Sequence, residues 1–331
     1  MPDVVIAVDA MGGDGPPAAR VEGAVEAVRE GGAEIALVGD ETALTAELER
    51  LDAEGLPVRV VPSEGVIAEG EHPALALRRK PESSIAVTLG LVKSGRAQAA
   101  VSMGSTGATM AASVLTLGMF PGLERPTLGG PFIGLAPRTT IIDLGANVDC
   151  KPSQLLSFGA LGASFTRAHL GVDDPRVGLL SVGAEEGKGN RQTQEALPLF
   201  QASGLNFVGN VEAHEIFAGR ADVIVCDGFV GNVLLKYTEG LAAAAGRYLA
   251  SALGPDSPAA QVIAGLADAA ESGGGPLFGV NGVVIAGHGR SSAQSIAQSI
   301  GLARRMLSIG LLDAMRADLA RALARAEAPG G

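Results

Sequence analysis

The chain has 331 residues, of which 47% are hydrophobic and 18% charged, so it can bury a large core and is not an intrinsically disordered polypeptide. A formal net charge of −11 argues against non-specific nucleic-acid binding. The two cysteines, Cys150 and Cys226, have no disulfide or metal-site spacing, so the reducing cytoplasm is the expected compartment. No apolar run reaches the roughly 18 residues of a membrane span, and no signal peptide is expected.

In chain order, short apolar runs alternate with longer helical patterns. Strands are expected over 4–8, 34–38, 58–61, 97–101, 140–144, 177–182, 223–226 and 283–286. Helices are expected over 16–31, 42–51, 83–94 and 153–169, with two more between 231 and 275 and a fraying tail from 322. This alternation predicts an α/β protein with a mostly parallel sheet and helices on both faces.

Glycine-rich turns follow many of these strands and open the next helix. They occupy 11–15, 102–107, 145–147, 183–190, 227–232 and 287–292. Ligands of open α/β sheets bind beyond the carboxyl ends of the strands, where backbone N–H groups and helix N-termini favour anions. The pattern therefore predicts an anion-binding site at one edge of the sheet.

These turns do not match the common nucleotide fingerprints. Residues 12–15 are not the dinucleotide pattern, and 183–189 is one residue short of a P-loop. Lys188 has glycine on both sides and could reach an anion, or it could be a solvated surface residue. Ser105 and Thr106 resemble an anion cradle, although an N-cap would also explain them. His288 could stabilise an oxyanion or protonate a leaving group, or simply hydrogen bond within its turn.

Taken together, the motifs resemble the PlsX family, the bacterial phosphate acyltransferases of phospholipid synthesis. The segments that carry the resemblance appear in family order: AVDAMGGDGPP (7–17), SMGSTGA (102–108), DLGAN (143–147), GLLSVGAEEGKGN (178–190), GNVE (209–212), CDGFVGNVLLK (226–236), PLFGVNG and AGHGRSS (276–292). The chain departs from the family at Ser105 and Ser181, where Asn is frequent, and at 272–275, where a Tyr-Gly-Gly-Ala is frequent.

The resemblance implies transfer of a fatty acyl group from acyl-carrier protein to inorganic phosphate. The acyl phosphate product would pass to a membrane glycerol-3-phosphate acyltransferase. The resemblance also implies a three-layer α/β/α, isopropylmalate-dehydrogenase-like fold with two lobes and a cleft, a homodimer, and peripheral contact with the inner face of the membrane. No metal or other cofactor is expected. A phosphotransacetylase acting on acyl-coenzyme A, an NAD-dependent dehydrogenase of the same fold and a membrane-recruiting scaffold for lipid enzymes remain as alternatives.

Roles within the expected site follow from the same motifs. Lys188, His288 and Asn190 are the expected catalytic residues. The expected substrate-binding residues are Asp9, Gly12, Gly13, Asp14, Ser105, Thr106, Gly107, Asn147, Asp227, Asn232, Arg290 and Ser291. Because Asp9 and Asp14 would repel phosphate, we expect them to orient backbone amides or a basic side chain, or to contact the pantetheine arm.

One catalytic unit is expected over 1–326. Its first lobe would comprise 1–127 and 276–326, and its second 128–275 with a helical hairpin at 231–275. The hairpin's apolar face is expected to be buried in a dimer, and the tip near Leu253, Val262 and Ile263 to meet the membrane interface. Carrier docking is expected at basic clusters, either Arg78 and Arg79 or the arginines of the C-terminal helices, which are Arg304, Arg305, Arg316 and Arg321.

Overall fold

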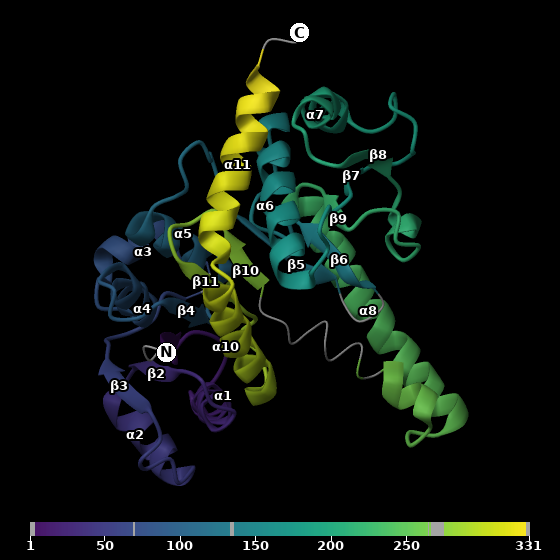
Figure 1. The fold of residues 1–331 in the computed structure, drawn as a ribbon. Helices are drawn as coiled ribbons and strands as arrows, with labels where there is room; N and C mark the ends of the chain where they lie inside the picture. The colour runs from purple at the N-terminus through teal and green to yellow at the C-terminus, as the bar shows by residue number, and fades with distance from the viewer. Residues whose placement is uncertain (1–3, 69, 133–135, 264, 266–274, 329–331) are drawn as a thin grey trace. The chain divides into compact units, whose positions relative to one another are not determined.

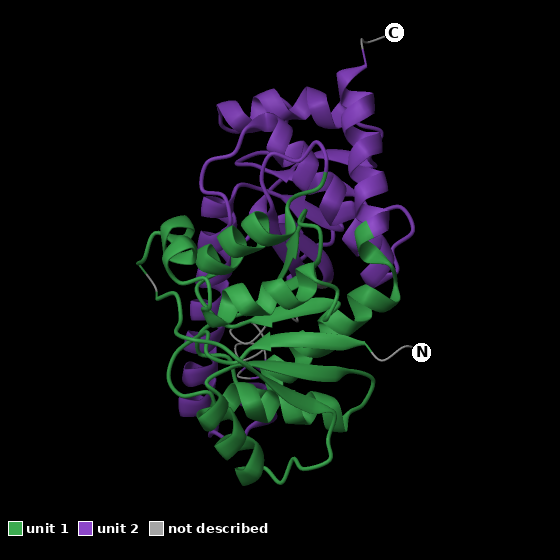
Figure 2. Cartoon of the chain, turned by 90° about the vertical axis from the view of Figure 1, so that its left-hand side faces the viewer, with its two compact units in different colours: residues 1–120, 272–312 green, residues 121–271, 313–331 purple. Residues whose placement is uncertain are grey.

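The computed structural model describes residues 4–328 except 69, 133–135, 264 and 266–274 (Figure 1). The chain divides into two compact units, which are coloured separately in Figure 2. Unit 1 comprises Met1–Phe120 and Ser272–Leu312, and unit 2 comprises Pro121–Glu271 and Asp313–Gly331.

Unit 1 is built on a sheet whose strands follow the order β3-β2-β1-β4-β11-β10. Their bounds are β1 Val5–Asp9, β2 Glu34–Gly39, β3 Val58–Pro62, β4 Ala99–Ser102, β10 Gly275–Phe278 and β11 Val283–Ala286. Only β10 runs antiparallel to its partner β11. The register pairs Ser102 with both Asp9 and Ala286, so β1, β4 and β11 end at the same level. Their three following loops therefore start side by side.

Helices cover both faces of this sheet. They are α1 Ala18–Arg29, α2 Glu41–Arg50, α3 Pro73–Arg79, α4 Ser84–Lys93, α5 Thr106–Leu117 and α10 Ala293–Ser308. In Figure 1, α4 and α5 pack together on one face, and α1 and α10 pack together on the other. The last pair approaches closely at Gly23, where a Cβ would lie 2.5 Å from the carbonyl oxygen of Ala293. The β-branched and alanine-rich strands between these layers form a buried core.

Unit 2 holds a second sheet, with strand order β5-β6-β9-β7-β8. The bounds are β5 Thr127–Phe132, β6 Ala136–Ile142, β7 Val177–Leu180, β8 Phe207–Val211 and β9 Val223–Val225, and only β5 is antiparallel. Its helices are α6 Pro152–Leu170, α7 Arg191–Ala202, α8 Gly228–Leu253 and α11 Leu311–Glu327, with a 3-10 turn at Ala213–Ile216. Helix α6 packs on β6 and β9 and is buried along most of its length, as its apolar run Leu155–Phe165 requires.

The α/β fold with a mostly parallel sheet between helices is confirmed. The expected strand 140–144 instead occupies 136–142, because β6 pairs with the unforeseen antiparallel β5. The two helices expected between 231 and 275 are separated at Gly254, where α8 has ended, and helical structure resumes at Pro258. Leu266 and 272–274 lie outside the described residues.

The expectation of a fraying tail from residue 322 is wrong. Helix α11 continues to Glu327, and Ala322 is buried because α11 packs on α6, where Arg167 pairs with Asp318. The lobe boundaries also differ from those expected. Unit 1 ends at Phe120 and the chain from Asp313 belongs to unit 2. The chain crosses between units within helix α11, and no composition change marks that point.

Candidate active site

The loop after β1 is organised by a buried carboxylate. Asp9 accepts hydrogen bonds from the backbone N–H of Gly12 at 2.9 Å and of Met11 at 3.3 Å, and from the Ser102 hydroxyl at 2.8 Å. Gly12 is required here, because a Cβ would lie 2.5 Å from Asp9 Oδ2 and 2.9 Å from the amide nitrogen of Gly104. Asp9 thus orients backbone amides and joins β1 to β4, the first of the roles expected for it.

Arg20, which the motifs did not single out, fixes the same loop from helix α1. Its guanidinium donates to the carbonyl oxygens of Ala10 at 3.1 Å, Asp14 at 3.0 Å and Gly15 at 2.9 Å, and the residue is 3% exposed. Burial lowers the pKa of Arg20, while the negative charges of Asp9 and Asp14 oppose that shift. An arginine in the first turn after Pro16-Pro17, next to an exposed glycine loop, is the signal that sequence analysis could have used.

The loops after β4 and β11 bring further expected residues to this edge. Gly13 adopts φ +101°, and a Cβ there would lie 2.8 Å from the Met103 carbonyl and 3.0 Å from that of Gly289. The three loops therefore touch through their backbones. The amide of Asp14 donates to Gly289 at 2.9 Å, which ties the first loop directly to the third.

The expected anion cradle lies at the start of α5. Ser105 is the N-cap residue, yet its side chain makes no capping hydrogen bond, so the capping alternative does not explain it. Ser105, Thr106 and Gly107 are all partly accessible. This helix N-terminus keeps its electropositive character without a carboxylate or hydroxyl cap.

His288, Arg290 and Ser291 lie in the loop after β11. The buried Ser291 hydroxyl accepts from the His288 amide at 3.3 Å, so it closes the turn. Arg290 is 93% exposed in its side chain and lies 3.4 Å from the Asp14 carboxylate. Such an exposed pair is weak, and an incoming anion could compete for Arg290.

In unit 2, a buried carboxylate likewise organises the loop after β6. Asp143 is fully buried and accepts from the amides of Gly145 at 3.0 Å and Ala146 at 2.9 Å. The Asn147 side chain donates to the same carboxylate at 2.7 Å and to the Pro126 carbonyl at 2.8 Å. Burial raises the pKa of Asp143, and these hydrogen bonds oppose the rise. Asn147 is therefore a buried structural link in this loop.

Asp227 and Asn232 lie at the start of α8. Asp227 caps the helix by accepting from the Val230 amide at 2.8 Å. The Asn232 side chain is exposed and lies beside Gly145, where a Cβ would be 3.5 Å from Asn232 Oδ1. The loops after β6 and β9 are thus adjacent, and Asn232 is the accessible amide between them.

Lys188 and Asn190 lie in the loop after β7. The Asn190 side chain caps α7, accepting from the Thr193 amide at 2.9 Å and its hydroxyl at 3.0 Å. That cap accounts for an asparagine at 190 without any substrate. Lys188 is exposed, and among the described residues no ion pair engages its ammonium. It is the accessible cation of this loop.

Asn210, on β8, fixes the conformation of the loop that contains Lys188. Its side-chain N–H₂ donates to the carbonyls of Glu185 at 2.9 Å and Lys188 at 3.5 Å, while the Lys188 amide closes a turn onto Glu185 at 2.9 Å. Asn210 is 3% exposed and its Oδ1 has no partner. The GNVE motif contained this residue, but spacing alone did not reveal its contact.

Cysteine and metal chemistry gain no support from the described part of the chain. Burial raises the pKa of Cys226, and it raises that of Cys150 to about 12, so neither thiol is set up as a thiolate nucleophile. No cluster of three or more His, Cys, Asp or Glu side chains suited to a metal occurs among the described residues. In the same residues, we find no helix with the length and apolarity needed to cross a bilayer.

Sequence similarity shows which family this α/β chain belongs to. The model of the fatty acid synthesis protein family matches residues 4–313. The phosphate acyltransferase of Pelotomaculum thermopropionicum is 45% identical over 324 residues, 95% of this chain and 94% of that protein. That of Moorella thermoacetica is 46% identical over 320 residues, 94% of each. The chain therefore belongs to this family, and the predictions of the PlsX resemblance and of an acyltransferase are confirmed.

Solved structures of similar fold are more distant in sequence. A phosphotransacetylase from Streptococcus pyogenes aligns with a TM-score of 0.60 at 19% identity, covering 92% of this chain and 94% of its own. A 4-hydroxythreonine-4-phosphate dehydrogenase from Klebsiella pneumoniae aligns with a TM-score of 0.56 at 15% identity, covering 92% and 97%. At these identities the likeness establishes the fold alone, which is shared by acyl-transfer and dehydrogenase proteins.

Proposed function

We propose that the chain transfers a fatty acyl group from acyl-carrier protein to inorganic phosphate, releasing acyl phosphate for phosphatidic acid synthesis. The observation that carries the proposal is identity of 45–46% to phosphate acyltransferases along more than nine-tenths of the chain. The loops support it, because they offer backbone amides, hydroxyls and one accessible lysine to an anion.

In the proposed reaction a phosphate oxygen attacks the carbonyl carbon of the thioester. The carbonyl oxygen becomes an oxyanion, the C–S bond breaks as the carbonyl re-forms, and the carrier thiolate leaves and takes up a proton. Phosphate is already nucleophilic near neutral pH and a thiolate is a good leaving group. The protein then has to bind, orient and neutralise charge rather than supply a covalent intermediate.

Roles follow from accessibility. In unit 2, Lys188 binds the attacking phosphate. In unit 1, the N-terminus of α5 at Ser105–Gly107 is a group suited to an anion. His288 stabilises the oxyanion or protonates the thiolate. Asp9, Asn147 and Asp227 instead set the conformation of their own loops after β1, β6 and β9, through hydrogen bonds to backbone and side-chain groups.

The experiment offers the purified chain inorganic phosphate and a palmitoyl thioester, carried either by acyl-carrier protein or by coenzyme A. Acyl phosphate is trapped with hydroxylamine and measured as the hydroxamate. Product with the carrier thioester supports the proposal. Product with the coenzyme A thioester alone would support the phosphotransacetylase alternative, and product with neither would favour a scaffold.

Assembly and location belong to the same proposal. We infer that two copies pair through one face of α8, where large apolar side chains stay exposed: Phe229 60%, Val233 52%, Tyr237 67% and Leu241 55%. These residues recur every four positions, so they share one side of the helix. Beyond that stripe, exposed Leu253 and Val262 form a tip that would touch the inner face of the membrane, where a glycerol-3-phosphate acyltransferase would receive the product.

A further inference from the structure

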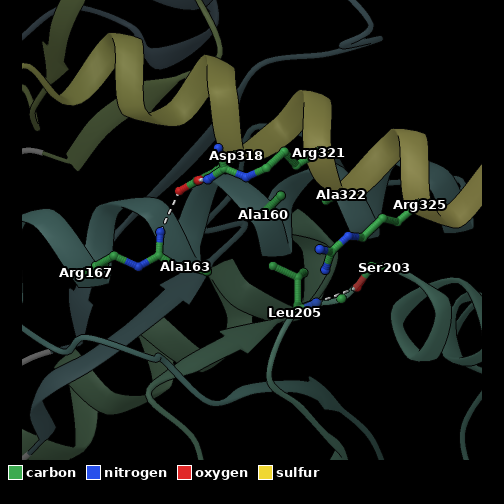
Figure 3. Close-up of a pocket in the computed structure, with 10 residues that line it drawn as sticks. Ala160, Ala163, Arg167, Ser203, Leu205, Asp318, Arg321, Ala322 and Arg325 are labelled. Atoms are coloured by element: carbon green, nitrogen blue, oxygen red, sulfur yellow. Dashed lines mark hydrogen bonds and ion pairs between the residues drawn. The ribbon is translucent and has the colours of Figure 1, made fainter.

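A small cavity in unit 2 is lined by basic side chains from helices far apart in sequence. It encloses about 100 Å³ between α6, the turn that follows α7, and α11. Figure 3 shows Arg167 reaching from α6 towards Asp318 on α11, while Arg325 points down from α11 to the turn at Ser203 and Leu205.

The lining carries an excess of positive charge. It contains three arginines, Arg167, Arg321 and Arg325, and a single acidic residue, Asp318. Arg167 lies 2.7 Å from one oxygen of Asp318, and Arg321 contacts the other. One carboxylate thus serves two guanidiniums. For the Arg325 guanidinium, the described residues provide no hydrogen bond or ion pair.

The cavity exists because small residues stand where helices meet. Ala160, Ala163 and Ala322 contribute only methyl groups to its wall, and all three are at most 2% exposed. Gly204 turns with φ +74°, and the Arg325 guanidinium lies where a side chain at 204 would be. A glycine at this turn therefore leaves room for the Arg325 guanidinium beside the backbone.

The cavity is separate from the loops of the candidate active site. Ser203–Leu205 precede β8, so they lie at the amino edge of the unit 2 sheet. The loops at 143–147, 183–190 and 226–232 follow their strands and lie at the carboxyl edge. A ligand bound here would not be the phosphate that attacks the thioester.

We propose that this cavity binds one tetrahedral oxyanion of the phosphate class. Its volume is on the scale of a single such ion, and guanidinium groups match oxyanions through paired, charge-assisted hydrogen bonds. Arg325 is the principal ligand, and Arg321 shares its charge between Asp318 and the ion. Binding would join α11 to α6 and to the α7–β8 turn. The ion is either free phosphate or the phosphate end of a monoester.

Calorimetric titration with inorganic phosphate and with methyl phosphate tests the site, using the full chain and Arg325→Gln. The control is Arg191→Gln, which removes another exposed arginine of unit 2, one whose ion pair is with Glu195. We expect Arg325→Gln to lose one binding event or weaken it at least about tenfold, Arg325→Lys to weaken it less, and the control to bind as the native chain does. Binding of both ligands would indicate a monoester-tolerant site, and binding of phosphate alone a free-ion site.

A crystal soaked in selenate gives an independent measurement. Anomalous selenium density between Arg321 and Arg325, absent from Arg325→Gln, would support the site. Indistinguishable titrations of the native chain and Arg325→Gln, or selenate density only at the glycine loops, would overturn it. Neither outcome depends on acyl phosphate formation, so this proposal and the proposed function can fail separately.

Discussion

Replacing Lys188 with alanine is expected to remove activity without affecting the fold. The loop conformation depends on main-chain groups and not on the ammonium: the Lys188 amide donates to the Glu185 carbonyl, and the Asn210 side chain donates to the carbonyls of Glu185 and Lys188. Because the side chain is exposed, the free energy of unfolding should change by no more than about 0.5 kcal/mol.

The catalytic loss can be bounded in two ways. Two unit charges about 4 Å apart at an effective dielectric constant of about 20 interact by roughly 4 kcal/mol. Removal of one preorganised group that stabilises transition-state charge typically costs about 10²–10³ in rate, or roughly 2.7–4 kcal/mol. We therefore expect Lys188→Ala to lower kcat/KM for phosphate by about two to three orders of magnitude, and Lys188→Arg to recover part of it.

The assay is acyl phosphate formation at subsaturating phosphate, with urea unfolding of the same samples. Lys93→Ala is the control, since Lys93 is also exposed but lies at the end of α4, outside the loops. Near-normal turnover of Lys188→Ala would refute the reasoning and make Arg290 or the α5 N-terminus the leading phosphate ligand. A large loss of stability would show that the side chain has a structural role.

Four further tests, each a single or double substitution, probe the other contacts. Arg20→Met should lower the unfolding free energy by about 2–4 kcal/mol in urea titrations, because three loop carbonyls lose a charged donor; a change as small as that of Arg29→Met would contradict this. Asn210→Asp should raise the KM for phosphate several-fold, while Asn206→Asp, on an exposed amide, should not. Equal effects of the two substitutions would show that Asn210 does not position the Lys188 loop for phosphate. Leu253→Asp with Val262→Asp should reduce liposome sedimentation and leave the dimer intact by light scattering, whereas monomers would assign the tip to the dimer interface. The double substitution of Arg78→Glu with Arg79→Glu should raise the KM for the carrier substrate and leave the KM for phosphate unchanged. Unchanged kinetics with both substrates would contradict this prediction.

Much of the fold follows from local pattern. The apolar runs at 34–38, 58–61 and 283–286 are strands within one residue of the expected bounds, since burial on both faces leaves a continuous hydrophobic signal. The antiparallel strands β5 and β10 were not predicted. In β5, Thr127–Phe132 contains two glycines and a proline, which are residues depleted in strands. The buried part of α11 was not predicted either, because the alanine- and arginine-rich sequence at 317–325 is equally typical of a solvated tail.

The candidate site was predictable to the level of loops and not of contacts. Glycine clusters marked the turns that follow the strands, and the register of β1, β4 and β11 places three of them together. Asn190 and Asp227 show the limit of motif reasoning, since both side chains cap helices. Asn210 was not identified as a site residue because it acts on a loop 22 to 25 residues earlier in the sequence, through hydrogen bonds that no spacing rule encodes. Arg20 lies only five to ten residues after the carbonyls it contacts, so its position in the first turn of α1 beside the glycine loop was a usable signal.

The buried aspartates resolve an apparent conflict, namely why loops meant for an anion contain carboxylates. Asp9 binds the amides two and three residues further on, and Asp143 does the same in the other unit. Each has a further side-chain donor, Ser102 for Asp9 and Asn147 for Asp143. A carboxylate saturated by such donors presents little free negative charge to solvent, and it fixes the direction of the peptide planes that follow it. Each buried aspartate therefore sets the geometry of its own loop, which leaves anion binding, in the proposed function, to accessible groups such as Lys188.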